Sequence, residues 1–182
     1  GPAAWNPDSD LAGLTSQGEL VSIPSRKNGS PEDIIGLQEL ILYGLKGAAS
    51  YADHALVLGK EDPAIYAAMH EGLDFLTKAD PSVDELLAWA LKVGEINLKV
   101  MELLYDANSG VYGVPEPTAV RVTPVKGKCI VVSGHDLYDL AQLLEQTEGK
   151  GINVYTHGEM LPCHAYPGLK KYKHLVGNYG GA

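Results

Sequence analysis

The sequence predicts an α + α/β fold, in which a three-helix bundle is followed by the first, incomplete part of a parallel α/β domain. Residues 30–110 hold three stretches with apolar positions three and four residues apart, each opened by a helix-start signal. In residues 128–182, short β-branched runs alternate with one amphipathic stretch, which is typical of a strand–helix–strand unit. Prolines and alternating Val and Thr in residues 111–127 indicate a linker between the two parts.

The chain opens with residues 1–29, which are poor in periodic apolar residues and rich in Gly, Ser, Pro and Asn. We expect an extended lead-in here, with a short helix near residues 11–14. The first helix of the bundle is predicted to begin with Ser30 as the N-cap and Pro31 at the first helical position. Gly59 is expected to end this helix.

The second and third helices carry their own start signals. Asp62, followed by Pro63, repeats the cap-and-proline pattern. Ser82 with Glu85 three residues later forms a capping box, and residues 108–110 (NSG) are expected to end the third helix. Three capped amphipathic helices with short connections predict an antiparallel three-helix bundle.

The α/β part is predicted from its alternation of strand and helix patterns. Residues 129–132 (CIVV) form a continuous β-branched run, which predicts a strand buried on both faces. Asp136 is the expected N-cap of the next helix, and residues 152–156 (INVYT) are the second, parallel strand. A short helical stretch around residues 168–172 and a third strand at residues 174–176 follow. Three strands are too few for a complete, Rossmann-like doubly wound sheet.

Composition and charge exclude several classes of protein. The 182 residues include 14 basic and 23 acidic side chains, and the formal net charge of −9 argues against nucleic-acid binding, which needs a basic face. Two cysteines are too few for a disulfide framework, an all-cysteine zinc site or an all-cysteine iron–sulfur site. No apolar run approaches the roughly 20 residues of a membrane span, and no signal peptide opens the chain. We therefore expect a soluble, cytoplasmic protein that binds neither nucleic acid nor membrane.

Two candidate ligand residues follow the predicted strands. His135 comes after the first strand, and Glu159 comes after the second. Because adjacent parallel strands lie about 4.8 Å apart, loops leaving their carboxyl ends can point side chains into one small volume. Imidazole and carboxylate together suit iron, zinc or manganese, and they also suit acid–base work. The alternative is that His135 packs in a turn and Glu159 only begins a helix.

Further histidines and cysteines lie near this pair in the sequence. His157 or His164 could complete a mononuclear metal site, which would make the protein a metal-dependent hydrolase. Cys163 could also join, but a buried small residue is the favoured interpretation both for it and for Cys129. Two single helical histidines are expected to have surface or packing roles: His54 and His70.

Several long strings match a known family in order. They are residues 132–137 (VSGHDL), 143–149 (LLEQTEG), 154–162 (VYTHGEMLP) and 175–181 (LVGNYGG), with similar helical segments at residues 37–54, 81–85 and 108–116. Together they closely resemble the hybrid cluster protein family, which comprises the prismane proteins or hydroxylamine reductases. The related carbon monoxide dehydrogenases share the fold but are not expected to match these strings so closely.

The resemblance implies a role for the two candidate ligands. Family members have a helical domain of two three-helix bundles followed by two α/β domains. They carry a cubane-type iron–sulfur cluster and a hybrid iron–sulfur–oxygen cluster, the latter at the meeting of the three domains. The family's Ser-Gly-His-Asp histidine falls on His135, and the glutamate of Thr-His-Gly-Glu-Met falls on Glu159. The resemblance therefore implies that both residues bind iron of the hybrid cluster.

The chain departs from the family pattern in its cysteines. The N-terminal cysteine motif, the cysteine ligands and the second glutamate ligand of the family have no counterpart in these 182 residues. We therefore expect a middle fragment of a hydroxylamine reductase, with no cluster and no activity by itself. The parent enzyme is expected to reduce hydroxylamine, or another small nitrogen oxide, with electrons from a redox donor. The remaining alternative is a non-enzymatic interaction module.

Overall fold

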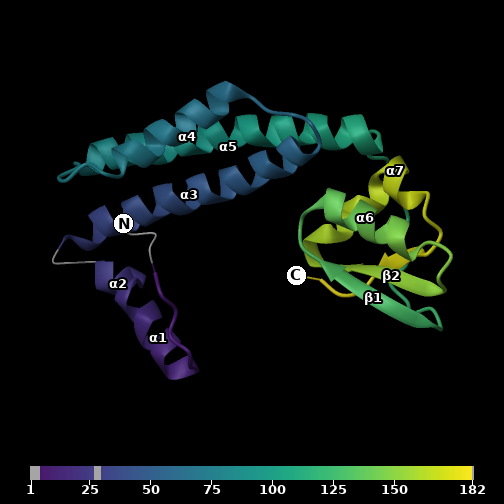
Figure 1. The fold of residues 1–182 in the computed structure, drawn as a ribbon. Coiled ribbons are helices and arrows are strands. Elements are labelled where there is room, and N and C mark those ends of the chain that lie inside the picture. Colours follow the sequence, from purple (N-terminus) through teal and green to yellow (C-terminus); the bar gives the residue numbers. More distant parts are fainter. Residues whose placement is uncertain (1–4, 27–29, 182) are drawn as a thin grey trace.

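The computed structural model describes residues 5–26 and 30–181, so part of the expected lead-in lies outside the described residues. An elongated group of helices stands beside a smaller α/β part (Figure 1). In chain order the elements are α1 (Leu11–Leu20), α2 (Ile23–Arg26), α3 (Glu32–Val57), α4 (Pro63–Phe75), α5 (Val83–Tyr112), β1 (Lys128–Ser133), α6 (Leu137–Thr147), β2 (Ile152–His157), the 3-10 helix η1 (Gly158–Ala165), α7 (Pro167–Lys170) and β3 (Leu175–Asn178). The predicted α + α/β class is confirmed, while the exact domain boundaries stay a prediction.

The starts of the helices follow from local chemistry. A side-chain oxygen of Asp62 accepts the backbone N–H two residues later, and Ser82 and Glu85 form the predicted reciprocal capping box. The prediction that Ser30 caps α3 is wrong by one residue. Pro31 has an extended ψ of 142° and itself occupies the cap position, so it cannot be the first helical residue.

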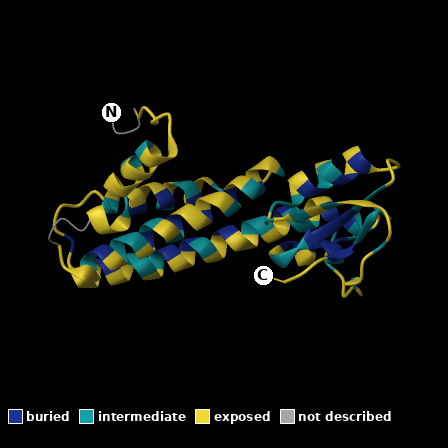
Figure 2. Ribbon diagram, turned by 90° about the horizontal axis from the view of Figure 1, so that it is seen from below, coloured by how far each residue is buried: buried dark blue, intermediate teal, exposed yellow. Residues whose placement is uncertain are grey.

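The buried side chains form two hydrophobic clusters. Figure 2 shows buried positions gathered on the inward faces of the helices and in the sheet. The first cluster lies inside α3, α4 and α5 and contains Ile41, Leu45, Ala48, Ala52, Ile65, Met69, Leu86, Val93, Ile96 and Val100. The second lies between the sheet and the helices of the α/β part and contains Tyr112, Leu140, Leu144, Val154, Met160, Cys163, Tyr166 and Leu169. Each large apolar side chain buried in this way contributes roughly 1.5–3 kcal/mol to folding.

Helix α5 is longer than predicted, and its last residues reach the second cluster. Residues 108–110 do not end it; it continues to Tyr112, and Gly113 ends it with a φ of +87°. Tyr112 is buried, and its ring meets that of Tyr166 edge-on with centroids 6.4 Å apart. Gly110 lies inside the helix, where a glycine costs about 1 kcal/mol, and the contact of Tyr112 with the α/β core offsets this cost.

The three strands form one parallel sheet in the order β1–β2–β3. The predicted parallel pairing of the first two strands is confirmed, and the central strand β2 is buried at Val154, Tyr155 and Thr156. The prediction that the first strand is buried on both faces is wrong, because β1 is an edge strand with Val131 51% exposed. Cys129 is likewise exposed, contrary to expectation.

The proline-rich linker packs against the end of the sheet. The Arg121 carbonyl accepts the N–H of Asn178 at 2.8 Å, and the hydroxyl of Tyr155 accepts the N–H of Val125 at 2.6 Å. Gly177 is buried under the same linker, and a Cβ added there would lie 2.3 Å from the Arg121 oxygen. Hydrogen bonds therefore hold the linker against β3 and against the Tyr155 side chain of β2.

The described part of the lead-in is largely helical. Helix α1 spans ten residues and is longer than the short helix expected near residues 11–14. A side-chain oxygen of Asp10 accepts the N–H of Gly13 at 2.8 Å to cap it. None of the helices in the described ranges combines the length and apolar character needed to cross a membrane.

Candidate functional site at the carboxyl ends of two strands

The candidate ligands lie where β1 and β2 end. The register pairs Ser133 with His157, so the two strands end level with each other. Each strand then passes through a glycine with a positive φ, +127° after β1 and +57° after β2, a conformation that glycine adopts without steric cost. His135 and Glu159 follow these two glycines at the same offset. Equal offsets from paired strand ends bring both side chains to one edge of the sheet.

His135 and Glu159 are in direct contact. The Nε2 of His135 lies 2.6 Å from the Oε2 of Glu159, so the imidazole N–H donates a hydrogen bond to the carboxylate. Their side chains are 48% and 68% exposed, and an ion pair so open to solvent contributes only about 0–1 kcal/mol to stability. The prediction that the two residues lie close together is confirmed. The contact itself therefore contributes little to the stability of the fold.

A cavity of about 260 Å³ lies beside this pair, between the bundle and the α/β part. Its walls are mainly apolar and aromatic: Tyr51, Met101, Leu104, Tyr105, Asn108, Leu137, Met160, Pro162, Cys163 and Tyr166, with His135 and Glu159 also lining it. It is smaller than the roughly 300–1,000 Å³ of pockets that hold drug-sized ligands. The cavity therefore has room for a small ligand.

The structure does not bring the other two histidines to the pair. The Nδ1 of His157 lies 3.1 Å from the Ser133 hydroxyl, and His164 is buried with its Nε2 2.9 Å from the Thr156 hydroxyl. Burial lowers the pKa of His164, although a hydrogen bond with the backbone acts in the opposite direction. Within residues 5–26 and 30–181, no group of three His, Cys, Asp or Glu side chains could hold a metal ion. The three-ligand mononuclear site is therefore not formed.

The two cysteines have contrasting surroundings. Cys163 is buried beside the cavity, as predicted, and burial raises the pKa of its thiol to about 12. A buried thiol of this kind is unreactive in the folded chain. Cys129 is exposed near the opposite end of β1, four residues before Ser133. At about 3.3 Å per residue, it lies roughly 13 Å along the strand from the site.

The donors of the pair fit part of an iron site. Imidazole and carboxylate both bind iron, and they leave it a harder centre than thiolates do. An iron–sulfur cluster needs further ligands, which the described residues do not supply around His135 and Glu159. The pair can therefore provide two ligands of a shared site, provided that the remaining ligands come from other residues.

Sequence reasoning missed the residues of α3 that lie against the site. The ring of Tyr51 is 6.4 Å from that of His135, and the Nε2 of His54 is 3.9 Å from a carboxylate oxygen of Asp136. These contacts join residues about 80 positions apart in the chain. The only local signal is that Tyr51 and His54, three residues apart, share one side of a helix.

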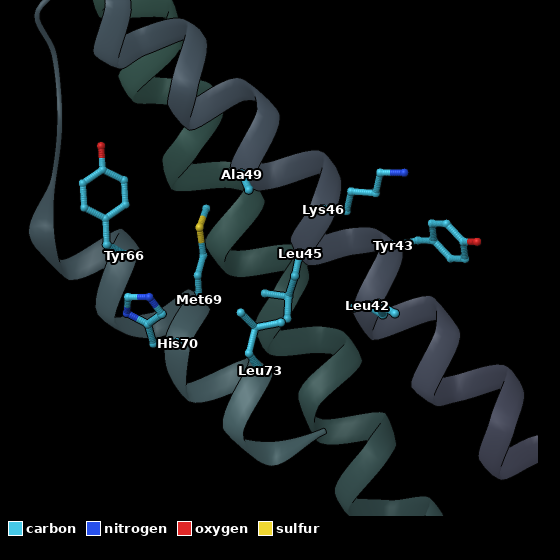
Figure 3. A pocket seen from close by; sticks show the side chains of 9 residues that line it. All are labelled: Leu42, Tyr43, Leu45, Lys46, Ala49, Tyr66, Met69, His70 and Leu73. Carbon is cyan, nitrogen blue, oxygen red and sulfur yellow. The ribbon is translucent and has the colours of Figure 1, made fainter. Parts of the chain in front are cut away.

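A larger hollow of about 570 Å³ lies elsewhere, between α3 and α4. Figure 3 shows Leu45, Met69 and Leu73 between the two helices, with Tyr66 and His70 on the α4 side. His70 is its only His, Cys, Asp or Glu residue, and the other walls are mainly apolar. The hollow is therefore a packing feature of the bundle and offers no metal site.

Comparison with known proteins identifies the family. Residues 4–182 match the Prismane/CO dehydrogenase family. Curated relatives named hydroxylamine reductase include proteins from Burkholderia ambifaria (58% identical over 182 residues), Burkholderia lata (57% over 182) and Syntrophobacter fumaroxidans (53% over 180). The matches cover 99–100% of this chain but 33% of each relative, so the chain spans about a third of their length. The resemblance seen in the motif strings is confirmed, and the chain belongs to the Prismane/CO dehydrogenase family.

Proposed function

We propose that this chain is the part of a hydroxylamine reductase of the hybrid-cluster type that supplies His135 and Glu159 as iron ligands. The observation that carries the proposal is the 2.6 Å separation of His135 Nε2 and Glu159 Oε2, in a chain of the Prismane/CO dehydrogenase family. The name of the relatives indicates the reaction. In it, hydroxylamine takes up two electrons and two protons and gives ammonia and water.

Each ligand has a defined task in this proposal. When bound, the hybrid cluster supplies the electrons for the reduction, which a separate redox donor replenishes. His135 gives iron the lone pair of Nε2, so the proton that this atom donates to Glu159 must leave when the metal binds. Glu159 contributes a carboxylate oxygen from the adjacent loop. Both side chains remain open to solvent, so ligands from other residues have access to the same metal.

The test uses the full-length protein that contains this segment, purified without oxygen. The changes are His135→Ala and Glu159→Gln, and the measurements are iron per chain and the rate of hydroxylamine reduction. Residues that merely orient a ligand typically contribute about 10–100-fold to metal affinity or activity. We expect each direct-ligand variant to lose at least that much, because it removes a donor atom altogether.

Matched controls are His70→Ala and Glu145→Gln, since both residues are exposed on other helices. They should keep the iron content and activity of the unmodified protein. Full iron content and full activity in both site variants would refute the proposal. The 182-residue chain alone should show no hydroxylamine turnover after anaerobic incubation with iron and sulfide, because the pair lacks further ligands; turnover by this chain would contradict the proposed division of ligands.

A further inference from the structure

Helix α3 of the bundle reaches the candidate ligand His135. Tyr51 and His54 lie on the same side of this helix, three residues apart. The centroid of the Tyr51 ring is 6.4 Å from that of His135, with the rings tilted by 56°, and 5.9 Å from that of His54. Tyr51 also lines the small cavity beside His135 and Glu159. The Tyr51 ring therefore contacts the candidate ligand His135 and also lines the cavity beside it.

A second residue of α3, His54, lies close to the residue next to His135. The Nε2 of His54 lies 3.9 Å from Oδ2 of Asp136, and the two side chains are only 18% and 28% exposed. The other oxygen of Asp136 accepts the N–H groups of Tyr138 and Asp139 at 2.7 and 3.2 Å, which caps α6. Asp136 therefore connects the start of α6 to α3, directly beside the candidate ligand.

The loop that carries His135 has little support of its own. Gly134 has a φ of +127°, and a Cβ added there would meet nothing within 4 Å. The His135 side chain is itself 48% exposed. A glycine in open space leaves the backbone free to change direction. The direction of the imidazole thus depends on contacts from outside the loop. Glu159 and, from α3, Tyr51 contact the imidazole itself, and His54 of α3 contacts the neighbouring Asp136.

Packing alone does not explain the histidine on α3. Burial leaves the Nδ1 of His54 without a hydrogen-bond partner among the described residues, which is unfavourable for a polar atom. An apolar side chain would fill the same space without this cost. The contact of Nε2 with Asp136 is what the imidazole adds.

We infer that Tyr51 and His54 are positioning residues for His135. Tyr51 restrains the His135 ring, and His54 restrains Asp136, so that the imidazole faces Glu159 in the orientation that binds iron. The bundle in this way sets the geometry of a ligand that belongs to the α/β part. This inference rests on the proposed function of His135 as an iron ligand.

The test uses the full-length, iron-loaded protein. Tyr51→Leu removes the ring, Tyr51→Phe keeps it, and His54→Ala removes the contact with Asp136. The measurements are iron per chain, the electron paramagnetic resonance spectrum of the cluster, and kcat and KM for hydroxylamine. Tyr51→Leu and His54→Ala should alter the spectrum and lower kcat roughly 10–100-fold, as for other residues that orient a metal ligand. Tyr51→Phe should restore the original spectrum and kcat.

Two controls separate positioning from general damage to the bundle. Tyr43→Leu changes a half-exposed tyrosine of the same helix, and His70→Ala changes an exposed histidine of α4; both should match the unmodified protein. Losses in these controls equal to those of Tyr51→Leu and His54→Ala would overturn the inference. Circular dichroism checks folding, and if Tyr51→Leu does not fold, His54→Ala decides the question.

The outcomes also distinguish this inference from the proposed function. If His135→Ala disrupts the cluster but Tyr51→Leu and His54→Ala leave the spectrum and kcat unchanged, the positioning role is overturned alone. An equal loss in Tyr51→Phe and Tyr51→Leu overturns it too, because the ring would then not be what matters. If His135→Ala itself leaves iron content and spectrum unchanged, the proposed function fails, and the inference fails with it.

Discussion

The close packing of the linker against β3 makes Gly177→Ala a sharp test of the structure. A Cβ at this position would lie 2.3 Å from the Arg121 carbonyl oxygen and 3.1 Å from the Arg121 carbonyl carbon. The obstacle is backbone, so it cannot rotate away as the end of a flexible side chain can. The same carbonyl accepts the N–H of Asn178 at 2.8 Å, and a shift that relieves the clash lengthens that hydrogen bond.

The expected loss of stability follows from three contributions. Forcing a methyl group into a well-packed site costs roughly 1–3 kcal/mol, and losing a hydrogen bond costs about another 1 kcal/mol. Replacing glycine recovers roughly 0.5–1 kcal/mol, because alanine restricts the unfolded chain more. We therefore expect Gly177→Ala to lower the free energy of unfolding by roughly 2 kcal/mol.

The assay is urea unfolding of the 182-residue chain, followed by circular dichroism and tryptophan fluorescence. Both tryptophans, Trp5 and Trp89, lie outside the α/β part, so fluorescence follows the helical part separately. The matched control is Gly94→Ala in α5, where an added Cβ meets nothing within 4 Å. The control should raise stability by about 1 kcal/mol, because alanine is the better helix former. A Gly177→Ala variant as stable as the unmodified chain would refute the packing argument.

Three further predictions concern other parts of the chain. In the folded protein, a thiol reagent at pH 8 should modify the exposed Cys129 but not Cys163, because burial raises the pKa of Cys163 to about 12. Counting the reactive thiols before and after denaturation checks this. Two fast-reacting thiols before denaturation would contradict it. Ser82→Ala should cost about 1 kcal/mol by removing the cap of α5, measured by urea unfolding with Trp89 fluorescence. The side-chain hydrogen bond from Lys78 and bonds from Ser82 lower the pKa of Glu85 from 4.5 to about 2, so its stabilising contribution is complete above pH 4.5 and is lost as the pH falls toward 2. Glu85→Gln should flatten the acid-unfolding curve in that window, and an unchanged curve would argue against this contribution.

Features that depend on a few neighbouring residues could be predicted from the sequence. The caps at Asp62, Ser82 and Asp136 need only a side-chain oxygen within reach of backbone N–H groups two or three residues away. The meeting of His135 and Glu159 could also be predicted. It requires only that two adjacent parallel strands end level, as β1 and β2 do, so that their loops leave the same edge of the sheet.

Features that depend on distant contacts could not be predicted. The sequence Asn-Ser-Gly resembles a helix end, but α5 continues because Tyr112 gains burial against Tyr166, more than 50 residues away. The β-branched run of β1 resembles a buried strand, but its exposure depends on which elements cover it and not on its own residues. The contacts of Tyr51 and His54 with the loop after β1 leave no mark in the sequence, because they depend on how the bundle packs against the sheet.

The placement of the two cysteines explains how a cysteine-poor segment fits an iron–sulfur family. Cys163 lines the same cavity as His135 and Glu159, but among the described residues it does not form with them a group that could hold a metal ion. Cys129 is exposed but lies at the far end of β1 from the site. Neither thiol is suited to join the pair, whose own donors are a nitrogen and an oxygen. In the proposed function, this segment therefore supplies only the nitrogen and oxygen ligands. The thiolates must come from other residues of a longer protein, since each relative is about three times as long as this chain. Substituting both cysteines with serine should then leave the iron content of the full-length protein unchanged, and a loss of iron would show that one of them is a ligand.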